Sequence, residues 1–420
     1  TIEPDPDADL PGGVAMGRQL TVKAMSKWRI GRLGLKIRPT TLVNIFAYDE
    51  VIALDPYHYP VRVVLRLLPK LLYRLLVNSR GQGNALVTGL IRGCLDAGVS
   101  ITTETAAQRL VQNEQGRVTG AEVVSGNVSR IISARRGVLL ASGGFEWNEE
   151  WRSEHFPYAH SMGSPPSNTG DGQRMAAEVG AHLDRMTEAN IFPCFPTRYE
   201  GRDMSMPFTY QAEKHAIVVN QRGERFISEN SYNIGELMNQ RNPNTGEFVN
   251  YPAWLIADRR FLKQALPFHW FVRHDKNFVK RAASLDELAG ITQIPVDALR
   301  GTIERFNGFC ERDVDEDFGR GAGTWEAYKV HGAPSKLTPI EEAPFVAIEI
   351  GRHVLGTKGG PRTDAGGRVL REDGSVIEGL YAAGLAMANP FGTRALGAGT
   401  TLGPNLTWGF ICGESVATAT

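Results

Sequence analysis

The sequence predicts an α/β fold with a second region of mixed α+β character. A chain of 420 residues is long enough for two domains, and 42% hydrophobic residues with 46 glycines suit a globular α/β protein. Apolar strands that stop on glycines occur at 137–144 and at 379–384. After Leu183 the pattern changes to proline- and aromatic-rich segments with polar turns. We therefore expect two domains, with a change of character after Leu183.

Residues 61–77, VRVVLRLLPKLLYRLLV, predict a helix with one cationic stripe. The stripe repeats every four residues and consists of Arg62, Arg66, Lys70 and Arg74. Four charges in this segment exclude a membrane-spanning helix. Two interpretations stay open. The helix makes a peripheral contact with an anionic membrane surface, or it is half-buried against the protein or another subunit with its stripe in water.

The next segments predict a helix and then a series of strands. Apolar residues at helical spacing favour a helix over 84–97, and 99–103 is predicted as a strand. Two or three antiparallel strands should follow, at 107–112, 117–124 and 128–133. Gly137–Ala141 is predicted as a buried strand that Ser142, Gly143 and Gly144 bring to an end.

Two further helices are predicted before the C-terminal stretch. The turn 168–172 opens a helix over 173–180, where Asp171 is placed to cap it by accepting backbone hydrogen bonds. Residues 295–308 are predicted as a helix with a proline in its first turn. The acidic string DVDEDFGRG at 313–321 is predicted as a solvated loop.

Charge and cysteine usage narrow the class of protein. Lys plus Arg equals Asp plus Glu at 46 each, which argues against a nucleic-acid partner. The four cysteines form no CxxC, so buried reduced thiols are expected. Histidines lack acidic or cysteine partners at ligand spacing, so no metal site is predicted. Without a signal peptide or transmembrane run, we expect a cytoplasmic protein, membrane-associated only if 61–77 meets lipid.

The stretch from Gly359 to Glu414 is the most informative. Its strand 379–383 ends on Gly384, and a loop with further spaced glycines then runs into an apolar helix. Glycines at this spacing let backbone N–H groups approach a ligand and present donors at a helix N-terminus. A negatively polarised ring edge, or an oxygen that gains charge during a reaction, would suit that terminus.

This stretch resembles the C-terminal cofactor segment of FAD-dependent enzymes of the fumarate reductase and 3-ketosteroid dehydrogenase superfamily. The resemblance extends, in the same order, to LLASGGF, NTGDGQRMAAEVGA, RGERFISEN, PAWLIADRRF and ALRGTIERFNGFCERDVDEDFGRG. Together these strings look most like the 3-ketosteroid dehydrogenase branch. The resemblance implies a Rossmann-like FAD-binding domain at 1–188 and 356–420. It also implies an inserted lobe at 189–355 that closes over the flavin and carries substrate groups.

The resemblance also implies the cofactor and the residues that bind it. These are Ala141, Ser142, Gly143, Gly144, Asp171, Gly384, Gly399, Thr400, Thr401 and Leu402. Such enzymes bind the FAD pyrophosphate with a strand, a G-x-G-x-x-G turn and a helix. This sequence contains no such turn, and its nearest match, 397–402, lacks the last glycine. We expect this βαβ segment to be missing by truncation. Loss from the protein and supply by a partner chain are the alternatives.

Tyr232 and Gly399 are the residues onto which the resemblance carries the chemistry. In ketosteroid dehydrogenases, a hydride leaves for flavin N5 while a tyrosine takes the proton from the carbon next to the ketone. Tyr232 follows RGERFISEN as the family's base follows its own such segment. Lowering a phenol pKa from about 10 to about 7 requires roughly 4 kcal/mol. Gly399 matches the glycine whose N–H holds the carbonyl oxygen, a contact that can contribute about 3 kcal/mol.

Three departures argue against ordinary 3-ketosteroid 1,2-dehydrogenation. The family's Y-P-G-A-G reads ALGAG at 395–399, so the carbonyl-holding tyrosine is missing. The paired tyrosines before LPGG become Pro6 and Asp7, which removes a helper hydroxyl. The family's A-A-G-N ends on Leu385 here, which removes a polar side chain near the flavin.

Arg394 offers a second chemistry. Fumarate reductases carry a carboxylate-gripping arginine one position later on this loop, and a planar guanidinium suits a carboxylate. A salt bridge or a flavin-phosphate contact would also explain Arg394. Fumarate reduction itself is not expected, because Leu262 and Phe391 occupy the places of that family's proton-donating arginine and loop histidine.

Three functions therefore stay open. The first is an FAD-dependent dehydrogenase acting on CH–CH next to the carbonyl of an alicyclic, steroid-derived or carboxylated ketone. The second is a flavin-dependent ene-reductase that acts on an unsaturated acid through Arg394. The third is a non-catalytic degenerate homologue that serves as an interaction subunit. A homo-oligomer, or a partner chain with the missing segment, is compatible with each.

Overall fold

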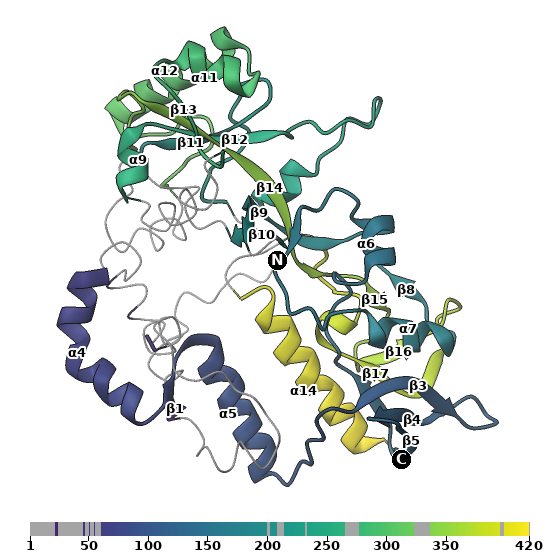
Figure 1. Ribbon diagram of the computed structural model, residues 1–420. Helices are drawn as coiled ribbons and strands as arrows, with labels where there is room; N and C mark the ends of the chain where they lie inside the picture. The colour runs from purple at the N-terminus through teal and green to yellow at the C-terminus, as the bar shows by residue number, and fades with distance from the viewer. Residues whose placement is uncertain are drawn as a thin grey trace. The chain divides into compact units, whose positions relative to one another are not determined.

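The computed structural model describes residues 22–23, 45–46, 50, 54, 60–199, 202–207, 214–231, 233–264, 277–322, 337–394 and 399–419 (Figure 1). The chain forms two compact units. The first comprises Thr1–Thr105 with Tyr328–Ala333, and the second comprises Ala106–Ala327 with Pro334–Thr420.

The described residues of the first unit form helices and a short strand pair. Its elements are β1 (Val22–Lys23), α4 (Pro60–Leu76), β2 (Ser79–Arg80) and α5 (Gln82–Asp96), with β1 antiparallel to β2. Both predicted helices are confirmed. Ile45 and Phe46 pack against Val63 and Leu71 of α4 in a small core.

Two expectations for the first unit are corrected. The cationic stripe does not lie wholly in water, because Arg74 is buried and donates to the buried carboxylate of Glu50 at 2.5 and 3.1 Å. Residues 99–103 form no strand. A strand needs a neighbour that takes its backbone hydrogen bonds, and the Val99 N–H instead closes the end of α5 by donating to Cys94 O at 2.9 Å.

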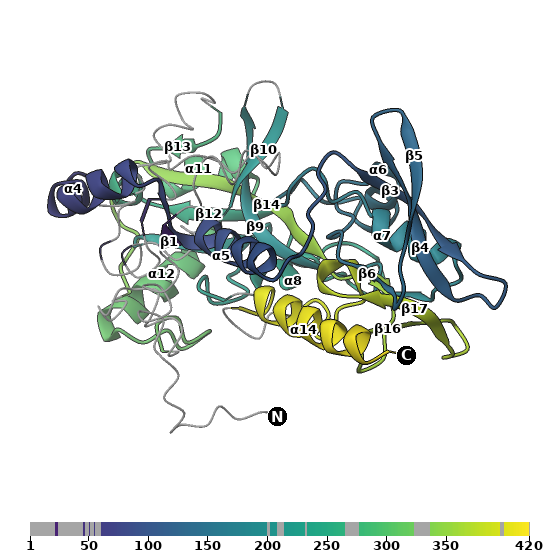
Figure 2. The ribbon, with the colours of Figure 1, turned by 90° about the horizontal axis from the view of Figure 1, so that it is seen from below.

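A seven-stranded sheet forms one end of the second unit (Figures 1 and 2). Its strands are β7 (Ser161–Met162), β9 (Ala189–Tyr199), β10 (Arg202–Pro207), β11 (Ala216–Asn220), β12 (Ala253–Ala257), β13 (Lys280–Ala282) and β14 (Phe345–Thr357). The main order is β10-β9-β14-β12-β11, and β7 and β13 also pair with β14. The 13-residue β14 therefore runs through the whole sheet, antiparallel to β12 in its first half and to β9 in its second.

Helices cover both faces of this sheet, which explains its nearly continuous apolar strands. One face packs against α8 (Ile234–Met238) and α9 (Arg259–Gln264), and the other against α11 (Leu285–Thr292) and α12 (Val296–Arg312). The helix predicted at 295–308 is confirmed, with Pro295 at its N-cap. The loop predicted as solvated at 313–321 is exposed over most of its length, but Asp315 and Arg320 are buried.

A smaller sheet and a meander form the rest of the second unit. The sheet has the order β16-β17-β6, from β6 (Val138–Leu140), β16 (Arg368–Leu370) and β17 (Val376–Ala382). The predicted antiparallel meander is confirmed as β3 (Ala106–Gln112), β4 (Val118–Ser125) and β5 (Val128–Ser133). In both views it lies at the opposite end of the unit from the seven-stranded sheet (Figure 2).

The remaining elements pack around the small sheet. They are α6 (Glu149–His155), α7 (Asp171–Glu178), the pair β8 (Leu183–Asp184) and β15 (Gly360–Pro361), the 3₁₀ turn η1 (Gly384–Ala386) and α14 (Leu402–Thr418). The core joins Leu140 of β6, Met175 of α7 and Leu380 of β17. Trp408 of α14 packs against this core. The predicted helices at 173–180 and after the glycine loop are thus confirmed.

Candidate functional site

The carboxyl ends of β6 and β17 meet at one edge of the small sheet. The two strands are parallel, with Leu140 opposite Ala382, and the Ala383 N–H donates to Leu140 O at 3.0 Å. Ala141–Gly144 and Gly384 therefore lie side by side, although 240 residues separate Gly144 from Gly384. Ligands of open parallel sheets bind at this edge, so the structure brings together the two predicted cofactor segments.

Glycine is required at this edge for conformation and for space. Gly143 has φ 89° and Gly384 has φ 72°, a left-handed region that disfavours other residues. A Cβ at Gly143 would lie 2.4 Å from Asn168 Oδ1. A Cβ at Gly144 would lie 2.2 Å from Glu146 Oε2. The glycine pair thus allows a close approach of neighbouring polar side chains.

Those side chains form a buried cluster that the sequence did not reveal. The fully buried carboxylate of Glu146 accepts from Asn168 Nδ2 at 2.8 Å and from Thr357 Oγ1 at 3.1 Å. Thr357 Oγ1 in turn accepts from the Phe145 N–H at 3.0 Å. The cluster ties the turn after β6 to the loop before α7 and to the end of β14.

Helix α7 is capped differently from the sequence prediction. Its N-cap is Gly170, and Asp171 is the exposed first residue of the helix. The acceptor is Ser142, whose Oγ takes a hydrogen bond from the Gly172 N–H at 3.1 Å. The prediction that Asp171 caps the helix was wrong because a neighbouring strand end supplies the cap, and sequence proximity does not show that.

Gln173 of α7 joins the two strand ends directly. Its Nε2 donates to Gly143 O and to Leu385 O, both at 3.1 Å. The side chain is fully buried, and within the described part of the chain its Oε1 has no hydrogen-bond partner. A buried acceptor without a donor is costly. Gln173 therefore offers a ligand one acceptor at this edge.

The start of α14 lies beside the same edge. A Cβ built at Gly384 would be 3.8 Å from the side chain of Asn405, whose buried Oδ1 also has no partner among the described residues. Gly399 has φ 92° and accepts from the Gly403 N–H at 2.7 Å. Of the other predicted cofactor residues here, Thr400 and Thr401 are partly exposed and Leu402 is exposed.

The loop that leads to α14 packs against a turn before β9. Gly392 lies so close to Glu188 that a Cβ would be 2.4 Å from Oε2. The Lys358 N–H donates to Glu188 O at 2.8 Å, and Lys358 O accepts from the Asn389 N–H at 2.8 Å. Burial lowers the pKa of the Lys358 ammonium, and the charge of Glu188 opposes this shift.

Arg394 connects the glycine loop to α8. Its Nε donates to Glu236 Oε2 at 3.2 Å, with side chains 74% and 36% exposed. The salt bridge, one of the interpretations of Arg394, is therefore present. Helix α8 begins two residues after Tyr232, so the segments of two predicted catalytic residues meet here. Tyr232 itself and residues 395–398 lie outside the described residues.

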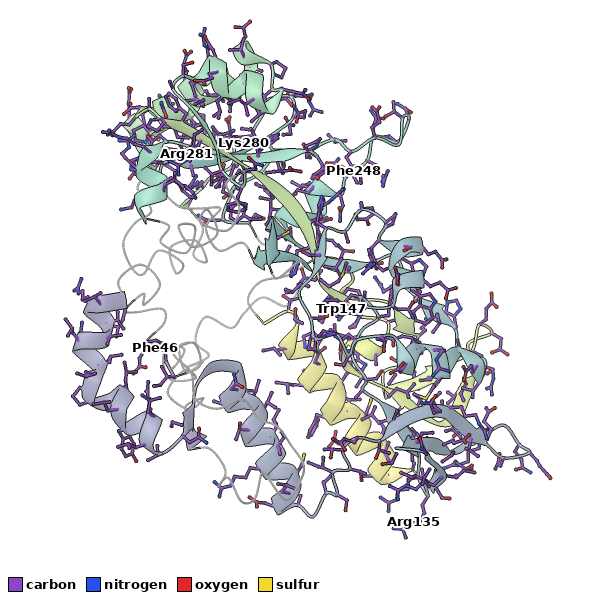
Figure 3. All side chains as sticks on the ribbon, viewed as in Figure 1. Phe46, Arg135, Trp147, Phe248, Lys280 and Arg281 are labelled. Atoms are coloured by element: carbon purple, nitrogen blue, oxygen red, sulfur yellow. The ribbon has the colours of Figure 1, made fainter. Side chains whose placement is uncertain are left out.

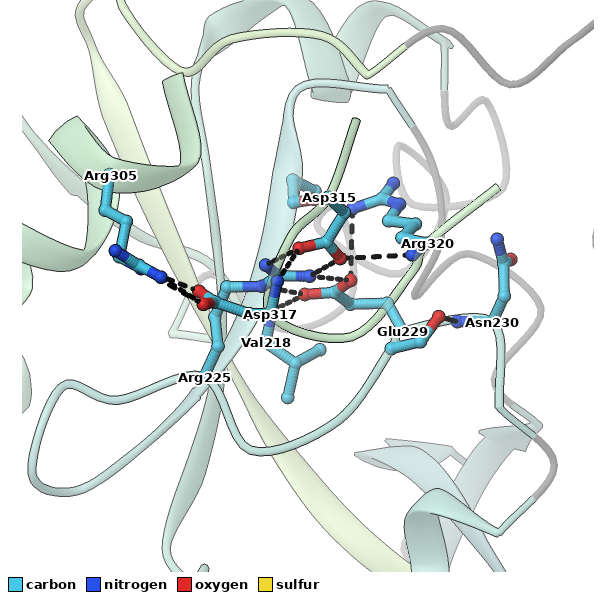
Figure 4. A network of polar contacts seen from close by, with 10 residues as sticks. Val218, Arg225, Glu229, Asn230, Arg305, Asp315, Asp317 and Arg320 are labelled. Atoms are coloured by element: carbon cyan, nitrogen blue, oxygen red, sulfur yellow. Dashed lines mark hydrogen bonds and ion pairs between the residues drawn. The ribbon is translucent and has the colours of Figure 1, made fainter. Parts of the chain in front are cut away.

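A buried ion network holds the segment that precedes Tyr232 (Figure 4). Arg225 donates to both carboxylate oxygens of Glu229 at 3.0 Å and to both of Asp315 at 2.8 and 2.9 Å. Arg320 adds a bond to Glu229 at 3.3 Å, and Glu229 also accepts from the Val218 N–H at 3.1 Å. The network fastens residues 225–229 to β11 and to the loop after α12.

The charges in this network set the protonation of its acids. Burial alone would raise the pKa of Glu229, but Arg225 and Arg320 outweigh it and hold that pKa below its ordinary value. The same holds for Asp315, where burial is outweighed by the hydrogen bonds and charge of Arg225. Both carboxylates are therefore ionised at neutral pH.

Another buried arginine, Arg352, lies among aromatic rings on β14. The Arg352 guanidinium carbon lies 4.1 Å from the ring centre of Phe248, 4.0 Å from that of Tyr251 and 4.9 Å from that of Tyr158 (Phe248 is labelled in Figure 3). Its Nε and Nη1 have no hydrogen-bond partner in the described ranges. Cation–π contact is thus the interaction that compensates its burial.

Metal, membrane and thiol expectations can be compared with the described residues. Among them, no group of three or more His, Cys, Asp or Glu side chains is placed to hold a metal ion. No described helix is long and apolar enough to cross a bilayer.

None of the four cysteines forms a disulfide bond, and only Cys194 and Cys412 are buried. The expectation of buried thiols is wrong for Cys94, which is exposed, and Cys310 is intermediate.

Residues 23–402 match the family described as the FAD binding domain. The chain belongs to this family. It is 36% identical over 373 residues to a 3-oxosteroid 1-dehydrogenase of Mycolicibacterium smegmatis, covering 81% of this chain and 63% of that protein. It is 33% identical over 353 residues to a 4-oxocyclohexanecarboxylate 2-dehydrogenase of Sinomonas cyclohexanicum, covering 80% and 61%. The chain thus spans less than two thirds of these relatives' lengths.

A solved structure shares the fold. The 3-ketosteroid Δ1-dehydrogenase of Sterolibacterium denitrificans, crystallised with 1,4-androstadiene-3,17-dione, matches with a TM-score of 0.75 and 29% identity over 89% of this chain and 71% of its own. The chain therefore has the mixed helix and sheet fold of FAD-binding flavoproteins, and its cofactor is FAD. The edge described above fits this group, with close backbone at two left-handed glycines and two buried acceptors, Gln173 Oε1 and Asn405 Oδ1.

Proposed function

We propose that this chain carries an FAD-dependent dehydrogenase activity that desaturates a CH–CH bond next to a ketone in an alicyclic or steroid-derived substrate. The observation that carries the proposal is the shared edge of β6 and β17. There the predicted flavin segments meet beside the start of α14, and Arg394–Glu236 brings the glycine loop to the segment that contains Tyr232. Bound FAD would supply the acceptor for the hydride.

In this proposal Tyr232 takes the proton from the carbon next to the carbonyl. The buried network at Arg225 and Glu229 supports the role, because it anchors the backbone three residues before the phenol. A base must be held within hydrogen-bond reach of its proton to be effective. The Gly399 N–H would hold the carbonyl oxygen, and its place one turn before the body of α14 adds the positive end of the helix dipole.

The substrate class follows from the site and the relatives together. The two relatives act, by name, on a 3-oxosteroid and on 4-oxocyclohexanecarboxylate, which share a cyclic ketone. Arg394 is mostly exposed and already paired with Glu236. That pairing favours the ketone over the ene-reductase alternative, in which Arg394 grips a substrate carboxylate.

The proposed lobe boundaries have support in the register of the large sheet. Ala189, where the inserted lobe is expected to begin, pairs with Thr357 of β14. The chain therefore leaves the first domain and returns to it at neighbouring points. We propose the inserted lobe at 189–355 on this basis.

The test uses the purified chain saturated with FAD, cyclic ketones as donors and an artificial electron acceptor. Tyr232→Phe should lower kcat at least about 100-fold, the usual contribution of a general base. Tyr158→Phe is the matched control, since it too removes one phenol hydroxyl. This variant should keep wild-type turnover. Equal turnover in Tyr232→Phe and wild type would exclude Tyr232 as the general base. A chain that takes up no FAD would support the degenerate-homologue alternative.

A further inference from the structure

Helix α4 exposes a continuous apolar arc. Its exposed large apolar side chains are Val61 at 72%, Leu65 at 69%, Leu68 at 43%, Leu72 at 52%, Tyr73 at 52%, Leu75 at 47% and Leu76 at 85%. At 100° per residue, all of these except Tyr73 lie within one arc of about 100° that runs the length of the helix. These side chains form one contiguous apolar patch, whereas exposed apolar residues on a soluble protein are usually scattered singly.

The arc is distinct from the side by which α4 is attached to its own unit. The buried positions are Val63, Leu71 and Arg74, which lie outside the arc. Val63 and Arg74 are opposite its centre, and Leu71 lies between them and one edge of the arc. Val63 and Leu71 pack against Ile45 and Phe46. The exposed leucines therefore do not serve the core that holds the helix.

Cations border the arc. Arg62 and Arg66 are exposed, and Lys70 is 55% exposed, along one flank of the apolar arc. Helix α4 contains no acidic residue. Glu50 neutralises part of the charge of Lys70 and Arg74 from the attached side. What remains facing outward is an apolar surface with a positive edge.

We propose that α4 lies in the plane of an anionic lipid surface, with its leucine arc among the acyl chains and Arg62 and Arg66 at the headgroups. Amphipathic helices bind membranes in this way. A helix of 17 residues, about 25 Å long, can lie in the interface, and it is not one that could span it. This inference does not depend on the proposed catalytic activity.

Charge complementarity favours lipid over a second copy of the chain. If two α4 helices packed antiparallel through their apolar arcs, the cationic flank of one would face the cationic flank of the other. No acid on α4 is available to compensate. An anionic surface meets the apolar arc and the cations together, and each cation near such a surface contributes about a fivefold factor in partitioning.

The experiment is co-sedimentation of the 420-residue chain with vesicles of phosphatidylcholine, with and without 30 mol% phosphatidylglycerol. We expect binding to the anionic vesicles that weakens as salt rises. Leu65→Asp/Leu72→Asp should lower the partition coefficient at least tenfold. Arg62→Gln/Arg66→Gln, which alters only exposed side chains, should lower it about 25-fold. Val128→Asp/Ile131→Asp on exposed β5 is the matched control and should bind as wild type.

Three results would overturn the proposal. The first is absence of wild-type binding to anionic vesicles, and the second is equal binding by wild type and the arginine variant. The third is a wild-type dimer in sedimentation velocity that Leu65→Asp/Leu72→Asp abolishes while vesicle binding is unchanged, since a second copy would then cover the arc. Thermal midpoints equal to wild type show that each variant is folded.

Discussion

The buried ion network allows a sharp comparison between two aspartates on one loop. Asp315 and Asp317 lie two residues apart, and each forms a bidentate pair with an arginine (Figure 4). The side chain of Asp315 is fully buried against Arg225, which is 3% exposed. The side chain of Asp317 is 26% exposed, and its partner Arg305 is 59% exposed. Both pairs join a carboxylate to a guanidinium, but only the Asp315 pair is buried, and Asp315 also accepts from the Arg320 N–H at 3.1 Å and the Asp317 N–H at 3.3 Å.

Asp315→Asn keeps the size of the side chain but leaves two arginines facing one carboxylate, Glu229. Removing one partner of a buried pair costs about 3–5 kcal/mol, because a buried charge loses its compensation. At about 2 °C per kcal/mol for a unit of this size, the thermal midpoint should fall by about 6–10 °C. Asp317→Asn should leave the midpoint near that of wild type, since solvent screens exposed pairs.

The assay is thermal unfolding of wild type and both variants at pH 7, monitored by tryptophan fluorescence. A pH series adds an independent check. The folded-state pKa values of Glu229 and Asp315 are lowered, so their stabilisation is present above about pH 4 and is lost as the pH falls through the lowered values. Equal midpoints for the two variants would refute the argument that burial, and not pairing, decides the contribution.

Three other predictions follow from buried groups. Burial lowers the pKa of His353 to about 4, so the free energy of unfolding should fall by up to about 1.4 kcal/mol per pH unit as the pH drops from 6.5 toward 4. In urea titrations, His353→Gln should flatten this pH dependence. Gln173→Leu should weaken FAD binding at least about tenfold in a flavin-fluorescence titration, because two carbonyls lose their donor, and unchanged affinity would contradict this. Arg352→Lys should cost about 1–2 kcal/mol in thermal unfolding because an ammonium cannot stack between rings, whereas the same change at exposed Arg241 should cost less.

Local patterns predicted most of the elements around the site. Helical spacing of apolar residues located α5, whereas the turn at 168–172 located α7 and the proline at 295 located α12. Apolar strands separated by turn residues located the meander β3–β5. The glycines after β6 and β17 marked the edge where the two strands end. These signals are short-range, since each depends on residues within one or two turns of one another.

Where a residue distant in the sequence supplies the interaction partner, predictions from local patterns were wrong. Acidic strings are usually solvated, yet Asp315 is buried because Arg225, 90 positions earlier, faces it. Asp171 looked like a helix cap, but Ser142 at the end of a neighbouring strand supplies the acceptor. In each case a residue distant in sequence supplied the partner, so the string itself carried no sign of it.

The sequence by itself determined the class of this protein and the cationic spacing of α4, and it predicted the cofactor segments, because composition and residue order are local properties. The tertiary structure alone decided which of those segments meet. The parallel register of β6 and β17 places Gly143 beside Gly384, and Gln173 bridges them from a helix between the two in sequence. It also decided that Arg74 turns inward to Glu50 while the leucines of α4 face outward. Proximity across hundreds of residues follows from packing and register, which short sequence patterns do not encode.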